Sequence, residues 1–223
     1  MKEKIVAVIP AYNEEKTIQK VIKEVKKHAD EVIIVNDASK DNTAKLAQEV
    51  GAIVISNENN LGYDGSINQG FEKAKEIGAT ILFTFDADGQ HEEKDLPKFL
   101  EPIKTREYHI VVGLRPSKPR FTEYIYAILS QSKLGVSDPL SGLKAYSIEA
   151  YNAIGYFDRL TSIGTELMFN CNKKGYKIKQ VPITIKPRAD ESRFGLHLKG
   201  NYKIMKAVIK MTFYHLFDKN NQK

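Results

Sequence analysis

Two aspartates, a primary amide and an imidazole stand close together directly after an apolar run. Residues 81–85 (ILFTF) are followed by Asp86, Ala87, Asp88, Gly89, Gln90 and His91. Burying two neighbouring carboxylates is costly unless a cation or hydrogen-bond donors satisfy them. The Asp88 carboxylate and the Gln90 amide offer hard oxygen donors, which suit Mg²⁺ or Mn²⁺. The segment is therefore either a polar turn at a strand end or a divalent-metal site, with His91 as a third ligand or as a neighbour of the ligands.

Two more acid-bearing segments follow short apolar runs earlier in the chain. Residues 5–9 precede PAYNEE at 10–15, and residues 32–35 precede NDASKD at 36–41. In parallel α/β sheets, ligands bind beyond the carboxyl ends of the strands, so the three loops are expected along one edge. Asp37, directly after its run, is interpreted as a ligand residue, and Asp41 as a helix cap.

The ligand of these loops is expected to be a nucleoside diphosphate held together with a metal. The sequence contains neither the glycine pattern of a dinucleotide-binding loop nor that of a P-loop. Carboxylates hold a phosphate only through a bridging cation, but they accept hydrogen bonds from ribose hydroxyls and base N–H groups. A nucleotide with Mg²⁺ or Mn²⁺ therefore satisfies all three loops at once.

Alternating strands and helices are predicted to position the loops. Ile18, Val21, Ile22 and Val25 recur at the spacing of one helical face. Strands are predicted at 5–9, 32–35, 52–55, 80–85 and 110–112, and helices around 18–25, 43–50 and 67–77. This order predicts an α/β fold with a mostly parallel sheet flanked by helices. We expect one domain over 1–223, with a nucleotide half near 1–115, an acceptor half near 116–195 and a C-terminal helix near 196–218.

Composition narrows the class of protein. With 223 residues, 42% hydrophobic and 28% charged, the chain fits one soluble globular domain. A lone cysteine, Cys171, excludes an internal disulfide, and no apolar stretch reaches the length of a membrane span. We expect a cytoplasmic location, extending to the inner face of the membrane. The net charge of +6 suits nucleic acid, anionic lipid or a phosphorylated substrate. Nucleic acid is disfavoured because acidic loops crowd the ligand edge and the lysines lack interleaved aromatic side chains.

The C-terminal segment has a basic amphipathic pattern. Apolar residues share one helical face and lysines an adjoining face: Leu198, Met205, Val208, Ile209, Phe213 and Leu216, against Lys199, Lys203, Lys206 and Lys210. A helix of this kind can lie on anionic lipid, which would make peripheral contact with a membrane or a membrane partner. The alternative is a helix that packs on the domain with a solvated lysine face.

The three loops together resemble the nucleotide-sugar segments of family 2 glycosyltransferases, which have the GT-A fold. Downstream, DPLSGLKAY at 138–146 and GYKIKQVP at 175–182 are similar to the polyprenyl-phosphate (dolichyl-phosphate) mannose or glucose synthase branch, and the resemblance covers roughly residues 4–195. It implies a metal-dependent, inverting transfer of a hexose from a UDP- or GDP-sugar to a polyprenyl phosphate. The alternative is a hydroxyl acceptor in capsule, cell-wall or other glycan synthesis.

The resemblance also implies roles for single residues. The residues that match the positions lining the base and ribose are Pro10, Tyr12, Glu14, Val35 and Asp37. Those near the nucleoside and diphosphate are Asp86 and Ala87, and Asp88 and Gln90 match the ligands of Mg²⁺ or Mn²⁺. Arg115 matches an arginine near the transferred or acceptor phosphate. A loop over the phosphates is matched by Arg188, Ser192 and Arg193.

The sequence departs from the family pattern at three places. Asn36 replaces an aspartate often found there, and the loop with Arg193 is one residue tighter than usual, with arginine where lysine is common. Family members with hydroxyl acceptors often carry a Glu-Asp pair near 164–166, where this chain has Glu166 alone. A lipid phosphate is already an anion and needs no base. Glu166 is therefore a base, a sugar contact or a structural residue, and Asp88, Arg115 and Glu166 are the candidate catalytic residues.

Overall fold

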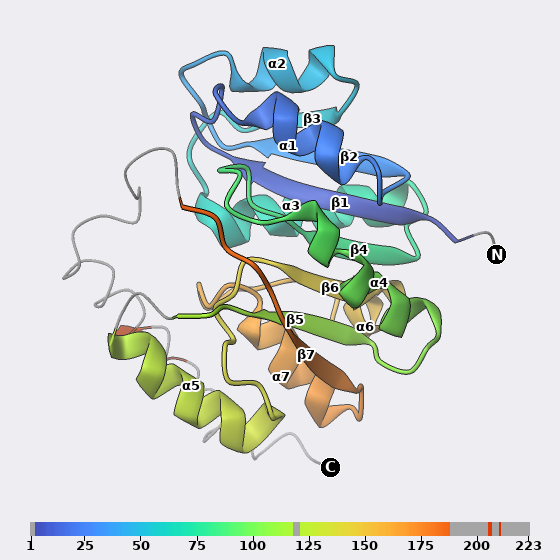
Figure 1. Cartoon of the computed structure of the whole chain (residues 1–223), viewed down its shortest axis with the longest axis vertical. Coiled ribbons are helices and arrows are strands. Elements are labelled where there is room, and N and C mark those ends of the chain that lie inside the picture. The colour runs from blue at the N-terminus through green and yellow to red at the C-terminus, as the bar shows by residue number, and fades with distance from the viewer. Residues whose placement is uncertain (1–2, 118–120, 188–204, 207–209, 211–223) are drawn as a thin grey trace.

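A computed structural model describes residues 3–117, 121–187, 205–206 and 210 of the chain. One seven-stranded sheet runs through them in the order β3-β2-β1-β4-β6-β5-β7 (Figure 1). The strands are β1 (Ile5–Ala11), β2 (Glu31–Asn36), β3 (Ile53–Ser56), β4 (Ile81–Thr84), β5 (Ile110–Leu114), β6 (Lys144–Ser147) and β7 (Ile178–Pro182). The α/β prediction is confirmed. Only β6 among these seven runs antiparallel to its neighbours, β4 and β5.

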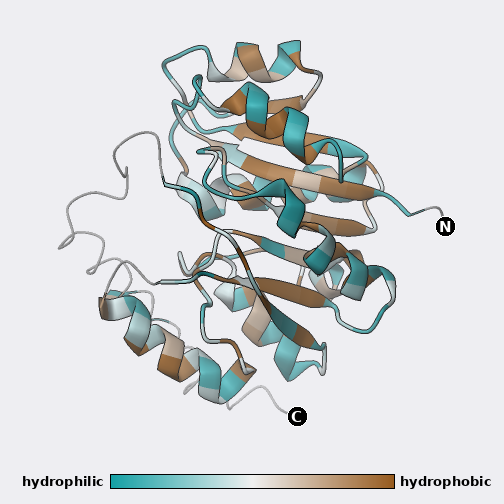
Figure 2. Cartoon of the chain, in the orientation of Figure 1, coloured by the Kyte–Doolittle hydropathy of each residue, from teal (hydrophilic) through white to brown (hydrophobic). Residues whose placement is uncertain are grey.

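Helices cover both faces of the sheet. They are α1 (Ile18–Val25), α2 (Thr43–Glu49), α3 (Gly62–Glu76), α4 (Pro97–Lys104), α5 (Phe121–Leu134), α6 (Ile148–Asn152) and α7 (Thr165–Lys173), with a 3₁₀ turn at Glu93–Asp95. One core layer lies between the sheet and α1, α2 and α4, and the other lies under α3, α5, α6 and α7. Figure 2 shows the hydrophobic residues gathered in the strands. Successive side chains of a strand point to opposite faces of the sheet, so each strand contributes to both core layers.

The predicted strands and helices are found at the expected positions, and their first and last residues differ by a few positions. Pro10 and Ala11 belong to β1, where they pair with Val35 and Asn36, so the first loop begins only at Tyr12. Helix α3 packs closely on β1, because a Cβ at Gly70 would lie 2.2 Å from Val8 Cγ1. Cys171 is buried in α7, as expected of an inert thiol.

The sheet brings the predicted loops to one edge. Strands β1, β2 and β4 are adjacent and parallel, so the segments after Ala11, Asn36 and Thr84 meet there. Strand β5 ends at the same edge and β6 begins there, which adds Arg115 and the 138–143 segment to it.

Some predictions fall outside the described residues. Arg188, Ser192 and Arg193 are among them, as is nearly all of the C-terminal segment at 196–218. Within the part of the chain that the structure describes, none of the helices combines the length and the apolar character needed to cross a bilayer.

Candidate active site at the carboxyl edge of the sheet

The loops after β1 and β2 are linked by hydrogen bonds. The Asn13 backbone N–H donates to Ser39 Oγ (2.9 Å), and the Asn13 side-chain oxygen accepts from the Lys40 N–H (2.7 Å). The Glu14 N–H donates to Thr43 Oγ1 at the start of α2 (2.7 Å). Asn13 and Ala38 have left-handed backbones, with φ of 53° and 62°. For alanine this conformation is strained, and strain of this kind clusters at ligand sites.

The residues predicted to surround the base differ in their access to solvent. The Tyr12 side chain is 38% exposed at the end of β1, and Glu14 and Pro10 are half-buried. A planar, exposed ring at this edge suits stacking on a nucleobase. Val35, by contrast, is fully buried in the core beneath α3. The Val35 side chain thus faces the core, and its place beside the base and ribose, which the family resemblance implies, stays a prediction.

Asp37 holds the start of α3. Its carboxylate accepts from the Leu61 N–H (2.7 Å), the Gly62 N–H (2.8 Å) and the Asn57 side-chain amide (3.0 Å), and the residue is 4% exposed. A carboxylate at a helix N-terminus is favoured by the helix dipole and by the unpaired N–H groups there. The structure thus gives Asp37 a structural role at the ligand edge, in addition to the predicted role, which stays a prediction.

Asp41 has the predicted capping role. Its Oδ1 accepts from the backbone N–H (3.0 Å) and the hydroxyl (2.5 Å) of Thr43, the first residue of α2. Burial opposes ionisation of this carboxyl, but the hydrogen bonds from Thr43 outweigh it and lower the pKa of Asp41.

The DADGQ loop after β4 is held in place at both ends. Thr17 Oγ1 donates to the Ala87 carbonyl (2.7 Å), which joins this loop to the one after β1. The Gln90 N–H donates to Asp88 Oδ1 (3.1 Å), and Gly89 supplies the left-handed turn between them, with φ of 73°. On the other side, Gln90 Nε2 donates to the Lys186 carbonyl (3.2 Å). Because the amide nitrogen takes this contact, the Gln90 amide oxygen is left for another partner.

The donor set of this loop fits a divalent cation that also binds its substrate. Asp88 and Gln90 are half-buried and provide a carboxylate and an amide oxygen. Among the described residues, no group of three or more His, Cys, Asp or Glu side chains could hold a metal ion. Few protein ligands are typical of Mg²⁺, which completes its shell with water and phosphate oxygens.

Asp86 is oriented by His91. Its Oδ2 lies 2.9 Å from His91 Nε2, and the imidazole is buried with its ring edge against Phe85. The Asp86 side chain remains 30% exposed. Burial raises the pKa of Asp86, but the hydrogen bond and charge of His91, followed by Arg115 and Lys144, outweigh burial and lower it. His91 is therefore a partner of Asp86, which supports the second of its two readings.

Close packing leaves no room for a side chain at position 142, on one side of the Asp86 carboxylate. A Cβ at Gly142 would lie 2.4 Å from Asp86 Oδ2, so only glycine fits there without a shift of the carboxylate. The Gly142 carbonyl accepts from Thr84 Oγ1 (2.6 Å) and from the Tyr63 hydroxyl (3.1 Å). The 138–143 segment thus closes directly over the end of β4.

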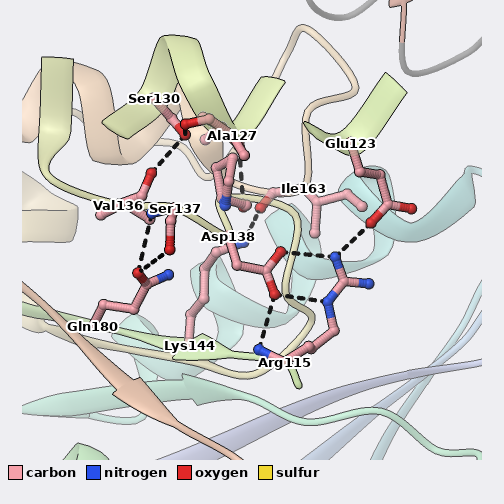
Figure 3. Close-up of polar contacts among 12 residues, drawn as sticks. Arg115, Glu123, Ala127, Ser130, Val136, Ser137, Asp138, Lys144, Ile163 and Gln180 are labelled. Carbon is pink, nitrogen blue, oxygen red and sulfur yellow. Dashed lines mark hydrogen bonds and ion pairs between the residues drawn. The ribbon is translucent and has the colours of Figure 1, made fainter. Parts of the chain in front are cut away.

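Arg115 is enclosed by carboxylates of the protein itself (Figure 3). Its Nε and Nη2 donate to the two oxygens of Asp138, each at 2.8 Å, and Nη2 also donates to Glu123 at 2.7 Å. Asp138 and Glu123 are 1% and 3% exposed. Burial disfavours the charge of Arg115, but the two carboxylates outweigh this and raise the pKa of the guanidinium. Sequence reasoning found Arg115 but missed both partners.

Lys144 was missed by sequence reasoning although it lies within DPLSGLKAY. It is fully buried, and its Nζ donates to the Ile163 carbonyl (Figure 3). Burial lowers the pKa of Lys144 to about 8, although Asp138, Asp64 and Asp158 favour the charged form. Burial and the charge of Asp158 raise the pKa of Asp64 to about 7. A lysine inside a strand gives no sequence signal of burial, because lysine is almost never buried alone.

Glu166 supports the backbone before α7. Its oxygens accept from the Tyr156 hydroxyl (3.0 Å) and from the Arg159 N–H (2.7 Å), and the residue is 2% exposed. Burial raises the pKa of Glu166. Asp158 similarly accepts from the N–H groups of Leu160, Ser162 and Gly164 at 2.8–3.1 Å. Of its three readings, the structural one is supported for Glu166, since both oxygens are occupied by protein donors.

The chain is similar to known proteins over most of its length. Residues 6–160 match the family model described as glycosyl transferase family 2. The UDP-N-acetylglucosamine–dolichyl-phosphate N-acetylglucosaminyltransferase of Methanococcus voltae is 32% identical, over 96% of this chain and 98% of its own length. The undecaprenyl-phosphate mannosyltransferase of Micrococcus luteus is 26% identical, over 96% of this chain and 94% of its own.

A solved structure shares the fold. Glucosyl-3-phosphoglycerate synthase from Mycobacterium tuberculosis, in complex with Mg²⁺ and UDP, superposes with a TM-score of 0.74 at 21% identity, over 93% of this chain and 79% of its own. Its complex with Mn²⁺, UDP and phosphoglyceric acid gives 0.73. The expected GT-A fold is confirmed.

Proposed function

Because the chain belongs to glycosyl transferase family 2 and is a glycosyltransferase, we propose that it transfers a hexose from a nucleotide sugar to a polyprenyl phosphate, with inversion at the anomeric carbon. The observation that carries the donor side is the DADGQ loop, whose Asp88 carboxylate and Gln90 amide oxygen stand at the carboxyl edge of β4. Relatives named as dolichyl-phosphate and undecaprenyl-phosphate transferases support the acceptor.

Asp88 and Gln90 are the residues that would hold Mg²⁺ or Mn²⁺. When bound, such an ion stabilises the negative charge of the departing diphosphate as a Lewis acid. Asp86, with its depressed pKa and its imidazole partner, stays ionised beside this position. Ala87 offers backbone atoms to the diphosphate, and Tyr12, Pro10 and Glu14 form the base side of the site. Asp37, which fixes the start of α3, would lie on the ribose side of the site.

The kind of acceptor depends on whether the site offers a general base. A sugar hydroxyl needs a general base, whereas a lipid phosphate is a nucleophile as it stands. Glu166 is buried with both oxygens hydrogen-bonded, so it is poorly placed to accept a proton from an incoming hydroxyl. This favours the phosphate acceptor over the hydroxyl acceptor. Arg115 would serve the acceptor side by holding the 138–143 segment through Asp138, and Arg188, Ser192 and Arg193 remain the proposed loop over the phosphates.

The test is release of nucleoside diphosphate from a panel of UDP- and GDP-hexoses with Mg²⁺ or Mn²⁺, with and without a short polyprenyl phosphate. We expect lipid-stimulated release and transfer of labelled sugar into the organic phase. Metal-dependent release that ignores the lipid would overturn the phosphate acceptor and favour a hydroxyl acceptor in glycan synthesis. Catalysis at the inner face of the membrane is part of the same proposal, because the acceptor is a membrane lipid.

A further inference from the structure

Helix α5 is apolar on its outer side as well as on its inner side. Its buried residues are Thr122, Glu123 and Ser130 together with Tyr126, Ala127 and Leu134, and its most exposed side chains over the first two turns are also apolar. These are Phe121 (75% exposed), Tyr124 (49%), Ile128 (71%) and Leu129 (40%), which we call the α5 stripe. A helix on a soluble domain normally turns its apolar face inward. The α5 stripe therefore needs an apolar partner that the described residues do not supply.

The stripe is large for a protein surface. Aromatic side chains have about 150–250 Å² each, so the four exposed side chains offer on the order of 500 Å² of largely apolar surface. That is at the upper end of what a monomer exposes, and patches of this size are often functional. In Figure 2 the ribbon of α5 includes brown, hydrophobic segments.

The stripe begins at the active-site edge. Glu123, in the first turn of α5, accepts from Arg115 Nη2 at 2.7 Å, and Arg115 directly follows β5. The first turn of α5 is therefore fixed to the site by a buried ion pair on its inner side, while Phe121 and Tyr124 point outward from the same turn. An apolar surface that starts at the acceptor side of the site lies where a lipid substrate would arrive.

We propose that the α5 stripe is the surface by which this enzyme lies on the lipid bilayer that holds its acceptor. The inference rests on the proposed function, since a polyprenyl phosphate is confined to a membrane. Aromatic and aliphatic side chains of this kind enter the boundary between head groups and acyl chains, and a net charge of +6 favours an anionic bilayer. A symmetric dimer through the stripe alone would bury roughly 1,000 Å² in total, which is only the lower limit of a specific interface.

The chain contains no tryptophan, which allows a single-site fluorescence test. Ile128→Trp reports on the stripe, and Lys20→Trp on α1, whose Lys20 side chain is 74% exposed, is the matched control. With vesicles of phosphatidylcholine and phosphatidylglycerol and no donor, we expect a blue shift of emission for Ile128→Trp and none for Lys20→Trp. A blue-shifted Ile128→Trp emission before vesicles are added would mean that protein covers the stripe, by the C-terminal segment or a second copy, and would overturn the proposal.

A second pair of variants separates apolar insertion from charge attraction. Phe121→Ser/Ile128→Ser should weaken vesicle binding about tenfold or more, and binding of the wild type should persist at high salt. Lys20→Ser/Lys23→Ser on α1 should bind as the wild type does. Equal binding by the stripe variant and the wild type, or release by the α1 variant alone, would contradict the proposal.

Docking and catalysis are then measured apart. The stripe variant should keep wild-type turnover with a short acceptor dispersed in water and lose it with a long-chain acceptor in vesicles. Transfer to the short acceptor without any vesicle binding would overturn the docking surface and leave the proposed function intact. Vesicle binding through the stripe without transfer to either lipid would overturn the proposed function and leave the docking surface standing.

Discussion

The two sides of the sheet edge use their charged side chains differently. After β1 and β4, Tyr12 and Asp86 remain 38% and 30% exposed, and the loops are held mainly by bonds between backbone groups and short side chains. After β5 and before β6, Arg115, Asp138 and Lys144 are bound to protein partners in a buried network. Apart from Asp37 and Asp41, which fix the starts of helices, the charged motif residues are thus partly exposed on the proposed donor side and part of the framework on the proposed acceptor side. The predictions below test that division.

The largest expected effect is on stability, at Arg115. Arg115→Met leaves the buried Asp138 and Glu123 carboxylates without their cation, so the free energy of unfolding should fall by about 3–5 kcal/mol. Arg115→Lys keeps the charge but loses the paired geometry and should cost less. Urea unfolding of the three proteins measures the difference. If Arg115→Met has the unfolding free energy of the wild type but needs a higher acceptor concentration for the same rate, Arg115 contacts the phosphate. It would then not be part of the framework.

Lys144 should give stability an unusual pH dependence. Its pKa is about 8 in the folded chain against 10.5 when unfolded. Below pH 8 both states are protonated and the cost of burying the charge is fully present. Between about pH 8 and 10.5 the folded chain has lost a proton that the unfolded chain keeps, so stability rises with pH, by up to ~3 kcal/mol.

The measurement for Lys144 is urea unfolding of the wild type and Lys144→Met from pH 7.5 to 10. The difference in unfolding free energy between the two proteins should change in favour of the wild type as the pH rises. Buried tyrosines such as Tyr146 have raised pKa values and act in the opposite direction above pH 10, but they are common to both proteins and cancel. A difference that stays constant across this range would show that Lys144 titrates near its ordinary pKa.

The donor side was largely predictable because its signals are local. Apolar runs and helical spacing placed β1 to β4 and α1 to α3 within a few residues, and the parallel topology then brought the three loops together. Asp88 and Gln90 could be named because they are separated from a strand end by only a short turn.

The acceptor side was not predictable, because its contacts join residues without a fixed spacing. Arg115 meets Glu123 and Asp138, which are 8 and 23 residues away, and Lys144 reaches Ile163. Nothing in a one-dimensional pattern tells a buried ion pair from a phosphate site, since both use arginine and both lie beside a strand end. The antiparallel insertion of β6 was missed for the same reason, as strand direction is set by a distant partner.

On the donor side, Asp88 should matter for turnover and not for folding. Asp88→Asn keeps the shape and the acceptor for the Gln90 N–H but removes the charge that would hold the cation. Metal-dependent turnover should fall about 100-fold or more, which corresponds to about 3 kcal/mol of activation free energy. The unfolding free energy should change by less than ~0.5 kcal/mol. Asp41→Asn is the matched control, since it should weaken the start of α2 and leave turnover intact. Retained Mn²⁺-dependent turnover in Asp88→Asn would remove the metal assignment.

The smallest effect on turnover is expected at Glu166. Its two readings, a structural residue or a general base, predict opposite results. If Glu166 is framework, Glu166→Gln loses one of its two accepted bonds, from Tyr156 or Arg159, and costs about 1 kcal/mol of unfolding free energy. Turnover should then stay within about threefold of the wild type and keep its pH profile. If Glu166 is a general base, turnover should fall about 10²–10⁴-fold and the acidic limb of the pH–rate profile should disappear. Rates of the wild type and Glu166→Gln, measured across pH with a short polyprenyl phosphate and with a glycan hydroxyl acceptor, decide between them, because only the hydroxyl brings a proton for Glu166 to remove.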